Sequence, residues 1–375
     1  MGLEPACRVL LAGPDLRRIG GVATYAGLLS KHINSARVRL TLRAVGRRPG
    51  RFWGQVWFRP STWVLNLLAF AWEVLLTRPD LVHLNPSLKW RSLPESLGFL
   101  LVARLAGRPA LVFFHGWDER IAQAMIRRRW NGRFLLSVLR LAQHYVVLAE
   151  GFRQQLISAG LPAGQISLSS LPVEVSQASR ALHGKHAATE PFRVLWLSIM
   201  LDSKGVWEML EAAEISRDAH PEARFEFVLA GTGSAYRSVQ AHIRRRGLQE
   251  LVRLCGEVVG GAKTQLFESA DIFVFPSKYR EGFPYVVVEA LAAGLPLVFT
   301  QVPALAETLS AQNGVGISSA DLSAAVLAQC IWELYAAPDR RRAIARANRS
   351  LAAERFSVEV VCRQMESLYL KLAGK

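Results

Sequence analysis

Residues 271–298, with the sequence DIFVFPSKYREGFPYVVVEALAAGLPLV, decide the fold of this 375-residue chain. The first seven are a short apolar run rich in aromatic and β-branched residues, which is typical of a buried strand. Residues 284–293 predict a helix, because proline is tolerated in a first turn and Gly294 can end the helix. The next strand begins at Leu295. This order of elements indicates a parallel α/β sheet, which binds ligands at the carboxyl ends of its strands.

Two carboxylates lie in this stretch. Glu281 falls in the predicted loop and Glu289 inside the predicted helix. At ~1.5 Å rise per residue they stand roughly 10 Å or more apart, which is too far for two carboxyl groups that share a proton. Between them, Gly282 permits close approach of a ligand, and the N–H groups of Phe283 and Tyr285 lie at the positive end of the helix, where an anion is favoured. The pattern fits a sugar, a diphosphate and a ribose; an ordinary strand–loop–helix with solvated or capping glutamates is the alternative.

The same stretch resembles the E-x7-E signature of the family-4 glycosyltransferases, which transfer sugars from nucleotide sugars. The matching motif is EGFPYVVVEALAAGLPLV, preceded by ADIFVFPS, and the similarity is strongest over residues 192–320. The resemblance implies an α/β protein of the GT-B fold: two Rossmann-like, doubly wound domains that face a cleft, with a C-terminal helix that crosses back to the first domain. It implies an N-terminal, acceptor-side domain at 1–176 with the helix at 357–375, and a nucleotide-sugar-binding domain at 177–356.

Length and composition agree with a chain of two globular domains. A hydrophobic content of 51% and a charged content of 20% exclude a disordered protein. The four cysteines form no C-x-x-C pair, which argues against zinc or a disulfide framework and indicates a reducing compartment. Residues 1–14 lack the features of a signal peptide, and the apolar stretch 63–76 is too short to span a bilayer. We therefore expect a cytoplasmic protein.

The charge of the chain is concentrated in its first half. Residues 1–176 contain 23 Lys and Arg against 9 Asp and Glu, a net of +14, whereas residues 177–375 have a net of +2. Arginines alternate with aromatic residues at 47–59 and again at 127–130, a mixture that suits an anionic membrane interface. The alternative is that these aromatics pack between layers of the domain. No nucleic-acid recognition motif accompanies them, so nucleic acid is not an expected partner. The predicted location is peripheral, on the cytoplasmic face of the plasma membrane.

Two features of the first half point to the ligand edge of its sheet. Gly20 and Gly21 lie between a predicted strand and a predicted helix, where glycine lets a phosphate approach backbone N–H groups, although a plain tight turn is as good an interpretation. His115 follows the predicted strand 110–114 and is succeeded by glycine. A lone histidine is more often structural. Family-4 enzymes have a similar glycine pair facing the donor diphosphate and a matching histidine that contacts the donor sugar.

In the second half, Lys204 stands at a predicted helix start, where an ammonium group can neutralise a diphosphate. The resemblance implies that this lysine binds the donor phosphates. The family often has an arginine five positions earlier, where this chain has Ile199, and Lys278 or Arg280 is the candidate to replace it. Gly233 resembles the family's glycine turn beside the nucleotide, with an ordinary tight turn as the alternative.

The residues predict metal-independent chemistry, because no D-x-D pair of metal-binding carboxylates occurs in the chain. The departing diphosphate must then be neutralised by cations and helix N-termini. The resemblance implies a retaining transferase that uses a UDP- or GDP-sugar and a saccharide acceptor, without a cofactor. The positive charge of the first half leads us to expect that the acceptor is lipid-linked. The implied catalytic residues are His115, Glu281 and Lys204, and the implied donor-binding residues are Gly20, Gly21, Gly233, Lys204, Gly282, Phe283, Pro284 and Glu289. A catalytically silent scaffold and a nucleotide-sugar epimerase of the same fold are the alternatives.

Overall fold

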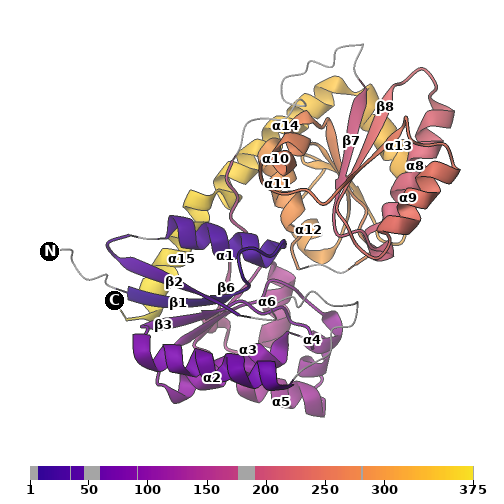
Figure 1. Cartoon of the computed structure of the whole chain (residues 1–375). Helices are drawn as coiled ribbons and strands as arrows, with labels where there is room; N and C mark the ends of the chain where they lie inside the picture. The colour runs from indigo at the N-terminus through magenta and orange to yellow at the C-terminus, as the bar shows by residue number, and fades with distance from the viewer. Residues whose placement is uncertain are drawn as a thin grey trace. The chain divides into compact units, whose positions relative to one another are not determined.

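The computed structural model describes residues 7–33, 35–45, 60–90, 92–175, 191–279 and 282–374. The chain divides into two compact units. The first comprises Met1–Pro172 and Val358–Lys375, and the second comprises Val173–Ser357. Each unit has a parallel sheet with helices packed on it (Figure 1).

The sheet of the first unit has six parallel strands in the order β2-β1-β3-β4-β5-β6. Their bounds are β1 (Cys7–Gly13), β2 (Val38–Ala44), β3 (Leu81–Leu84), β4 (Ala110–Phe113), β5 (His144–Val147) and β6 (Ile166–Leu168). The register places Cys7 opposite Val38 and Val82 opposite Ala110. Strands β3, β4 and β5 are buried along their whole length, as expected for parallel strands covered on both faces.

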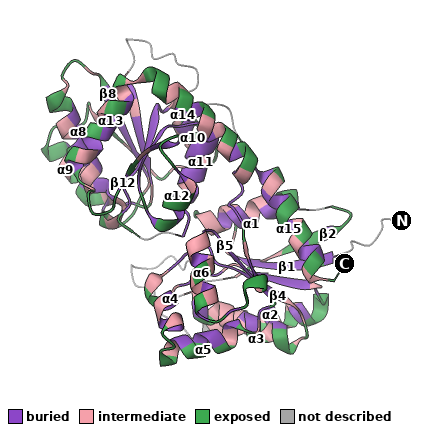
Figure 2. Cartoon of the chain, turned by 180° about the vertical axis from the view of Figure 1, so that it is seen from behind, coloured by how far each residue is buried: buried purple, intermediate pink, exposed green. Residues whose placement is uncertain are grey.

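Helices cover this sheet and present their outer faces to solvent (Figure 2). They are α1 (Gly21–His32), α2 (Pro60–Thr77), α3 (Leu93–Leu105), α4 (Glu119–Ile126), α5 (Trp130–Leu139) and α6 (Glu150–Ser158), with a 3-10 turn η1 at Ala163–Gln165. Helices α4 and α5 pack so closely that a Cβ atom at Gly132 would lie 2.1 Å from the carbonyl oxygen of Ala124. Glycine is therefore required where these two helices meet.

The last helix, α15 (Val358–Leu372), belongs to the first unit although the preceding residues belong to the second. Tyr369 on this helix is fully buried, and its hydroxyl lies 2.7 Å from Nδ1 of His83 on β3. The Sγ atom of Cys7 donates to the carbonyl oxygen of Tyr369 at 3.9 Å. The predicted return of the C-terminal helix to the first domain is confirmed.

The sheet of the second unit also has six parallel strands, in the order β9-β8-β7-β10-β11-β12. Their bounds are β7 (Phe192–Leu197), β8 (Phe225–Ala230), β9 (Val252–Gly256), β10 (Ile272–Phe275), β11 (Leu297–Thr300) and β12 (Gly314–Ile317). The Asn-Gly sequence at residue 313 predicts a turn over 313–316, which is wrong: Gly314 pairs with Leu297 at the start of β12. A Cβ atom at Gly314 would lie 2.0 Å from the carbonyl oxygen of Leu297, so here glycine serves close strand pairing.

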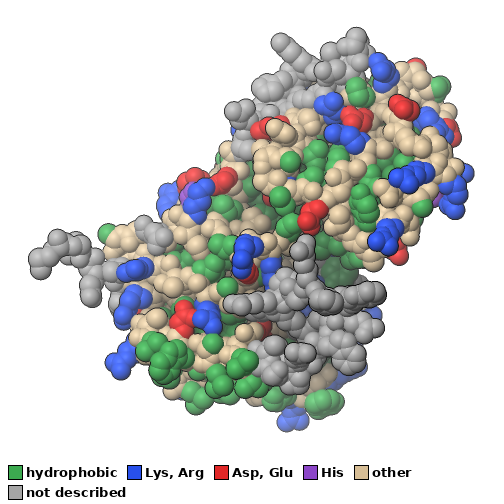
Figure 3. All heavy atoms as spheres, in the orientation of Figure 1, with side chains coloured by type: hydrophobic (Ala, Val, Ile, Leu, Met, Phe, Trp, Pro, Cys, Tyr) green, Lys and Arg blue, Asp and Glu red, His purple; other side chains and the backbone are tan. Residues whose placement is uncertain are grey.

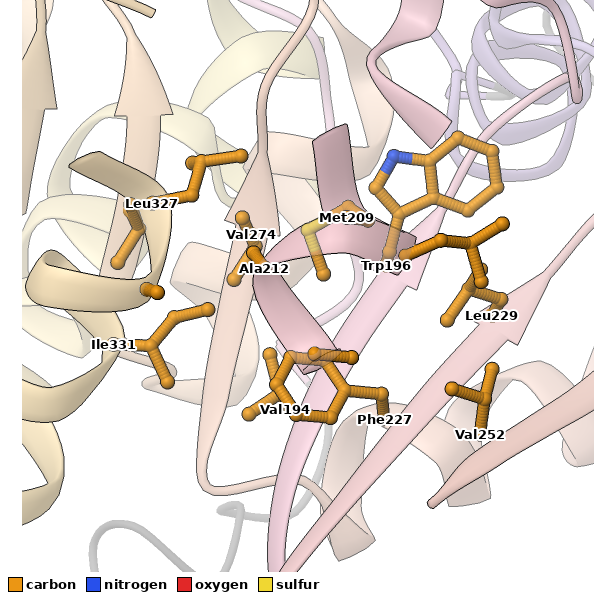
Figure 4. Packing of buried hydrophobic residues seen from close by; sticks show 14 of the residues in the cluster. Val194, Trp196, Met209, Ala212, Phe227, Leu229, Val252, Val274, Leu327 and Ile331 are labelled. Atoms are coloured by element: carbon orange, nitrogen blue, oxygen red, sulfur yellow. The ribbon is translucent and has the colours of Figure 1, made fainter. Parts of the chain in front are cut away.

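The helices of the second unit are α8 (Val206–Ala219), α9 (Tyr236–Arg245), α10 (Gly260–Ser269), α11 (Tyr285–Ala293), α12 (Pro303–Thr308), α13 (Ala324–Ala336) and α14 (Pro338–Leu351), with a 3-10 turn η2 (Asp202–Lys204) and a short π-helix η3 (Ala352–Phe356). Figure 4 shows the core between the sheet and helices α8 and α13, in which Trp196, Phe227 and Ile331 are buried. The predicted helix over 284–293 is one residue shorter at its start, since Pro284 is the N-cap of α11 and Gly294 ends the helix at a φ of 76°.

Candidate functional site

The strand order of the second unit identifies the edge of its sheet where a ligand binds. Strands β7 and β10 are neighbours, and the strands that follow them, β8 and β11, lie on opposite sides of the pair. This reversal is a topological switch point, and ligands of such sheets bind outside the carboxyl ends of the two central strands. The chain leaves β7 through η2 into α8, and it leaves β10 through residues 276–284 into α11.

Backbone contacts hold these two segments against each other. Gly205, which follows η2, has a φ of 74°, and a Cβ atom there would lie 2.2 Å from the carbonyl oxygen of Pro276. The N–H group of Lys278 donates to the carbonyl oxygen of Ser203 at 2.9 Å. Glycine is required at position 205 for both its conformation and the close approach of Pro276. The Lys-Gly pair is therefore held at the switch point by the packing of the chain.

Lys204 is the last residue of η2 and is partly exposed. Its Nζ atom lies 4.8 Å from the centroid of the Tyr279 ring, and its carbonyl oxygen accepts a hydrogen bond of 3.2 Å from Nε1 of Trp196. The tyrosine ring attracts the ammonium group electrostatically. Lys204 can therefore present a positive charge at the switch point.

Lys278 and Arg280 are the two candidates to replace an arginine at position 199, and the structure describes only the first of them. The Ile199 side chain is 63% exposed, so an apolar group stands on the surface at the position where the resemblance often implies an arginine. Lys278 forms an ion pair with Glu208 of α8, which offsets its charge. Arg280 lies outside the described residues.

Glu289 lies on α11 and faces α10. Its Oε1 atom is 2.6 Å from Nζ of Lys263, whereas its buried Oε2 atom has no hydrogen-bond partner among the described residues. Burial raises the pKa of the Glu289 carboxyl, and the nearby Lys263 ammonium opposes the rise. A buried carboxylate oxygen without a partner costs free energy, so a ligand hydroxyl that donates to it is strongly favoured. Sequence analysis missed Lys263, because the pair is 26 positions apart and only the packing of two helices brings it together.

The motif residues around Glu289 have several roles. Gly282 and Phe283 are buried, and the Phe283 ring packs on Phe356 with centroids 5.6 Å apart. Pro284 caps the helix that begins at Tyr285. Glu281 lies outside the described residues, so its predicted distance from Glu289 stays a prediction.

Gly233 has a structural reason to be glycine. A Cβ atom at this position would lie 2.3 Å from the carbonyl oxygen of Met200, and the N–H group of Met200 donates to the carbonyl oxygen of Thr232 at 2.9 Å. These contacts join the segment after β8 to the segment after β7. Its predicted contact with the nucleotide stays a prediction.

In the first unit, the switch point lies between β1 and β3, and His115 follows the neighbouring strand β4. Its Nε2 atom lies 2.8 Å from Oδ1 of Asn85, and Nδ2 of Asn85 donates to the carbonyl oxygen of Ala12 at 3.1 Å. Because Oδ1 can only accept, Nε2 of His115 carries the proton and Nδ1 keeps its lone pair. Burial lowers the pKa of His115 to about 3, so the ring is neutral at physiological pH. Sequence analysis missed Asn85, which fixes the tautomer.

Gly20 and Gly21 also lie in the first unit. Gly20 is the N-cap of α1, and its carbonyl oxygen accepts from the N–H group of Thr24 at 3.0 Å. A Cβ atom at Gly20 would meet no described atom within 4 Å. Packing therefore does not require glycine at position 20, in contrast to position 233, although its φ of 155° lies where side chains are rare.

Two further properties concern ions and membranes. Among the described residues, no group of three or more His, Cys, Asp or Glu side chains is arranged to hold a metal ion. None of the helices in the described part of the chain is both long enough and apolar enough to cross a bilayer.

Comparison with known proteins agrees with this geometry. Residues 20–171 match the family model "Glycosyl transferase 4-like domain", and residues 191–337 match "Glycosyl transferases group 1". The chain is 25% identical over 281 residues to the amylovoran biosynthesis glycosyltransferase AmsK of Erwinia amylovora, covering 72% of this chain and 65% of AmsK. It is 25% identical over 254 residues to the putative teichuronic acid biosynthesis glycosyltransferase TuaC of Bacillus subtilis, covering 66% and 59% of the two chains. The chain thus spans somewhat less than two thirds of these two relatives.

Among solved structures, HepE of Anabaena in complex with UDP-glucose has a TM-score of 0.72 at 17% identity, covering 96% of this chain and 99% of HepE. Two Rossmann-like units, each with a parallel six-stranded sheet, together with this structural neighbour define a protein of the GT-B fold. The two matched family models together cover most of the chain, and the chain belongs to the family-4 type of glycosyltransferases. The predicted family and fold class are confirmed.

Proposed function

We propose that this protein is a glycosyltransferase that moves a sugar from a nucleoside diphosphate sugar to a saccharide of the cell envelope. Glu289 carries the proposal: it stands after the switch-point strand β10, with one oxygen held by Lys263 and the other oxygen buried without a hydrogen-bond partner among the described residues. Such a carboxylate can accept a hydrogen bond from a ribose hydroxyl. The relatives named for amylovoran and teichuronic acid synthesis support a polysaccharide acceptor.

The donor in this proposal is a UDP- or GDP-sugar, and HepE, which was crystallised with UDP-glucose, supports the first of these. Glu289 holds the ribose, Glu281 holds the donor sugar, and Lys204 neutralises the diphosphate together with the N-terminal turn of α11. Gly282, Phe283 and Pro284 shape that turn. Gly20, Gly21 and Gly233 complete the donor-binding set.

The reaction we propose retains the anomeric configuration and needs no metal. As the bond from the anomeric carbon to the diphosphate breaks, negative charge grows on the leaving oxygen, where the ammonium group of Lys204 stabilises it. The acceptor oxygen bonds to the anomeric carbon on the face that the diphosphate leaves, and an oxygen of the departing diphosphate takes the proton of the acceptor hydroxyl. His115, which is neutral and carries its lone pair on Nδ1, accepts a hydrogen bond from a hydroxyl of the donor sugar.

The acceptor we propose is lipid-linked, which places the enzyme on the cytoplasmic face of the plasma membrane. The net charge of +14 on residues 1–176 supports an anionic surface as its partner. Nucleic acid has no part in the proposal.

The test is incubation of the purified protein with a panel of UDP- and GDP-sugars, followed by detection of the free nucleotide. Release of UDP or GDP that is accelerated by a saccharide acceptor is the expected result. Binding of a donor without release would identify a catalytically silent scaffold, and conversion of the sugar while it stays attached to the nucleotide would identify an epimerase.

A further inference from the structure

Helix α2 is attached to the first unit by one of its faces. The ring of Phe70 lies 4.3 Å from the ring of Phe99 on α3. A Cβ atom at Gly98 of α3 would lie 3.1 Å from Leu67, so glycine allows the two helices to approach closely. These apolar contacts attach the inner face of α2 to α3.

The opposite face of α2 is also apolar, yet it is exposed. Six large residues at helical spacing form it: Val64, Leu65, Leu68, Trp72, Leu75 and Leu76. Trp72 is 65% exposed and Leu65 is 64% exposed. A helix that is apolar all round is normally buried, and a large exposed apolar patch marks a contact site. Figure 3 shows hydrophobic side chains gathered over α2, with Lys and Arg side chains and one acidic group beside them.

The neighbouring helices also carry exposed apolar side chains. Helix α3 packs between α2 and α5. On α3, Leu105 is exposed beside Arg104, and on α5, Trp130 and Phe134 are exposed beside Arg133. We refer to these residues, together with the six of α2, as the α2–α3–α5 face. Each of its three helices contributes large apolar side chains, and two of them place arginine within the apolar group.

The segments that contain these residues expose charge of one sign. In the described segments 63–79, 92–108 and 127–140, the exposed charged side chains are seven arginines. The two glutamates of these segments are both partly buried. Glu73 pairs with Arg43 at 2.8 Å, and Glu95 accepts a hydrogen bond of 3.0 Å from Asn66. The surface is therefore apolar and positive, without an exposed carboxylate in these segments.

We propose that the α2–α3–α5 face docks on the surface of an anionic lipid bilayer. Tryptophan and phenylalanine side chains suit the headgroup region, and arginines suit lipid phosphates. A second copy of the chain fits less well, because a symmetric contact would bring the arginines of two copies together. The inference rests on the proposed function in one respect, namely that docking would deliver a lipid-linked acceptor.

The test compares binding to vesicles of phosphatidylcholine with and without phosphatidylglycerol, by sedimentation at low and high salt. We expect the wild-type protein to bind only the anionic vesicles and to dissociate as salt screens the arginines. The double variant Leu68→Gln/Trp72→Gln should bind about tenfold or more weakly, because two large side chains no longer leave water. Val259→Gln, at a site in the second unit where valine is 54% exposed, is the matched control and should bind as the wild type does. Quenching of tryptophan fluorescence by brominated lipid should decrease in Trp72→Phe.

Two results would overturn the inference. One is a wild-type protein that stays in the supernatant with anionic vesicles at low salt. The other is a double variant that binds vesicles as tightly as the wild type, or that instead loses a concentration-dependent self-association, which would assign the face to a second copy. Calorimetry with UDP keeps this proposal separate from the proposed function, since the double variant should bind UDP as the wild type does. If the protein binds vesicles but binds none of the nucleotide sugars, the docking proposal holds and the proposed transferase activity is wrong.

Discussion

Lys263 and Glu289 form a 2.6 Å ion pair that joins α10 to α11 at the edge of the second sheet. The lysine contacts only one of the two carboxylate oxygens, and the second is buried without a hydrogen-bond partner among the described residues. The ion pair therefore fixes the Glu289 carboxylate so that Oε2 can still accept a hydrogen bond from a ligand. A ribose that donates a hydroxyl to that oxygen would complete the set of hydrogen bonds.

Replacement of Glu289 by alanine should weaken donor binding by about ten- to hundredfold, because a hydrogen bond to a charged group contributes ~1.5–3 kcal/mol. Calorimetric titration with UDP and GDP measures the effect. Glu250→Ala, at an exposed site of the same unit, is the control for loss of a carboxylate. An unchanged affinity in Glu289→Ala would remove the ribose assignment.

Replacement of Lys263 by methionine should make donor binding dependent on pH. Burial already raises the pKa of Glu289, and the lysine opposes that rise, so its removal should raise the pKa further. Donor affinity should then fall as the pH drops and Glu289 takes up a proton. The measurement is the Kd for the nucleotide between pH 5 and 8. A pH-independent affinity equal to that of the wild type would show that Lys263 does not tune Glu289, and Lys263→Arg should restore most of the binding.

Replacement of Lys204 by alanine should lower kcat as well as affinity, because the charge on the leaving diphosphate grows in the transition state. The exposed Ile199 leaves Lys204 without the cation that the family has at that position. Steady-state kinetics at saturating donor measures the change. Normal turnover in Lys204→Ala would mean that another cation neutralises the leaving diphosphate.

Addition of Mg²⁺ or of EDTA should leave the rate of the wild-type enzyme nearly unchanged. The proposed mechanism neutralises the leaving group with an ammonium group and a helix N-terminus, so it needs no divalent ion. Dialysis against EDTA followed by a rate measurement, with Mg²⁺ restored in a parallel sample, gives the answer. Strict dependence on metal would contradict this mechanism.

The buried histidines of the first unit should make its stability depend on pH. Burial lowers the pKa of His115 to about 3, and burial, with a smaller electrostatic effect of the nearby His115, lowers the pKa of His83 to about 3. Between the unfolded pKa of about 6.5 and these values, the unfolded chain binds protons that the folded chain does not, so stability falls as pH falls. The slope should be about 1.4 kcal/mol per pH unit for each histidine.

Urea unfolding at pH 5, 6 and 7 measures this slope. His115→Gln should reduce it by the share of one histidine. Equal slopes in the wild type and in His115→Gln would mean that the His115 ring is protonated in the folded protein.

The sequence alone determined the class of fold and most of the elements of both sheets. The run at residues 272–275 and the helix ended by Gly294 are local features, because apolar runs and a glycine stop act over a few residues. The motif from Asp271 to Val298 also indicated the family, which the comparisons confirm. Local signals failed at β12. The Asn-Gly sequence predicted a turn, but Gly314 pairs with Leu297 of the neighbouring strand and begins β12.

The tertiary structure decided what the site residues contact. Lys263 reaches Glu289 and Asn85 reaches His115 only because helices and strands far apart in the sequence are packed together, and no spacing rule contains those pairs. The same holds for α2: its sequence is apolar on both faces, and only the packing of one face on α3 shows that the other is left to water. Which face of an apolar helix is buried depends on its neighbours, and these are chosen by the whole fold.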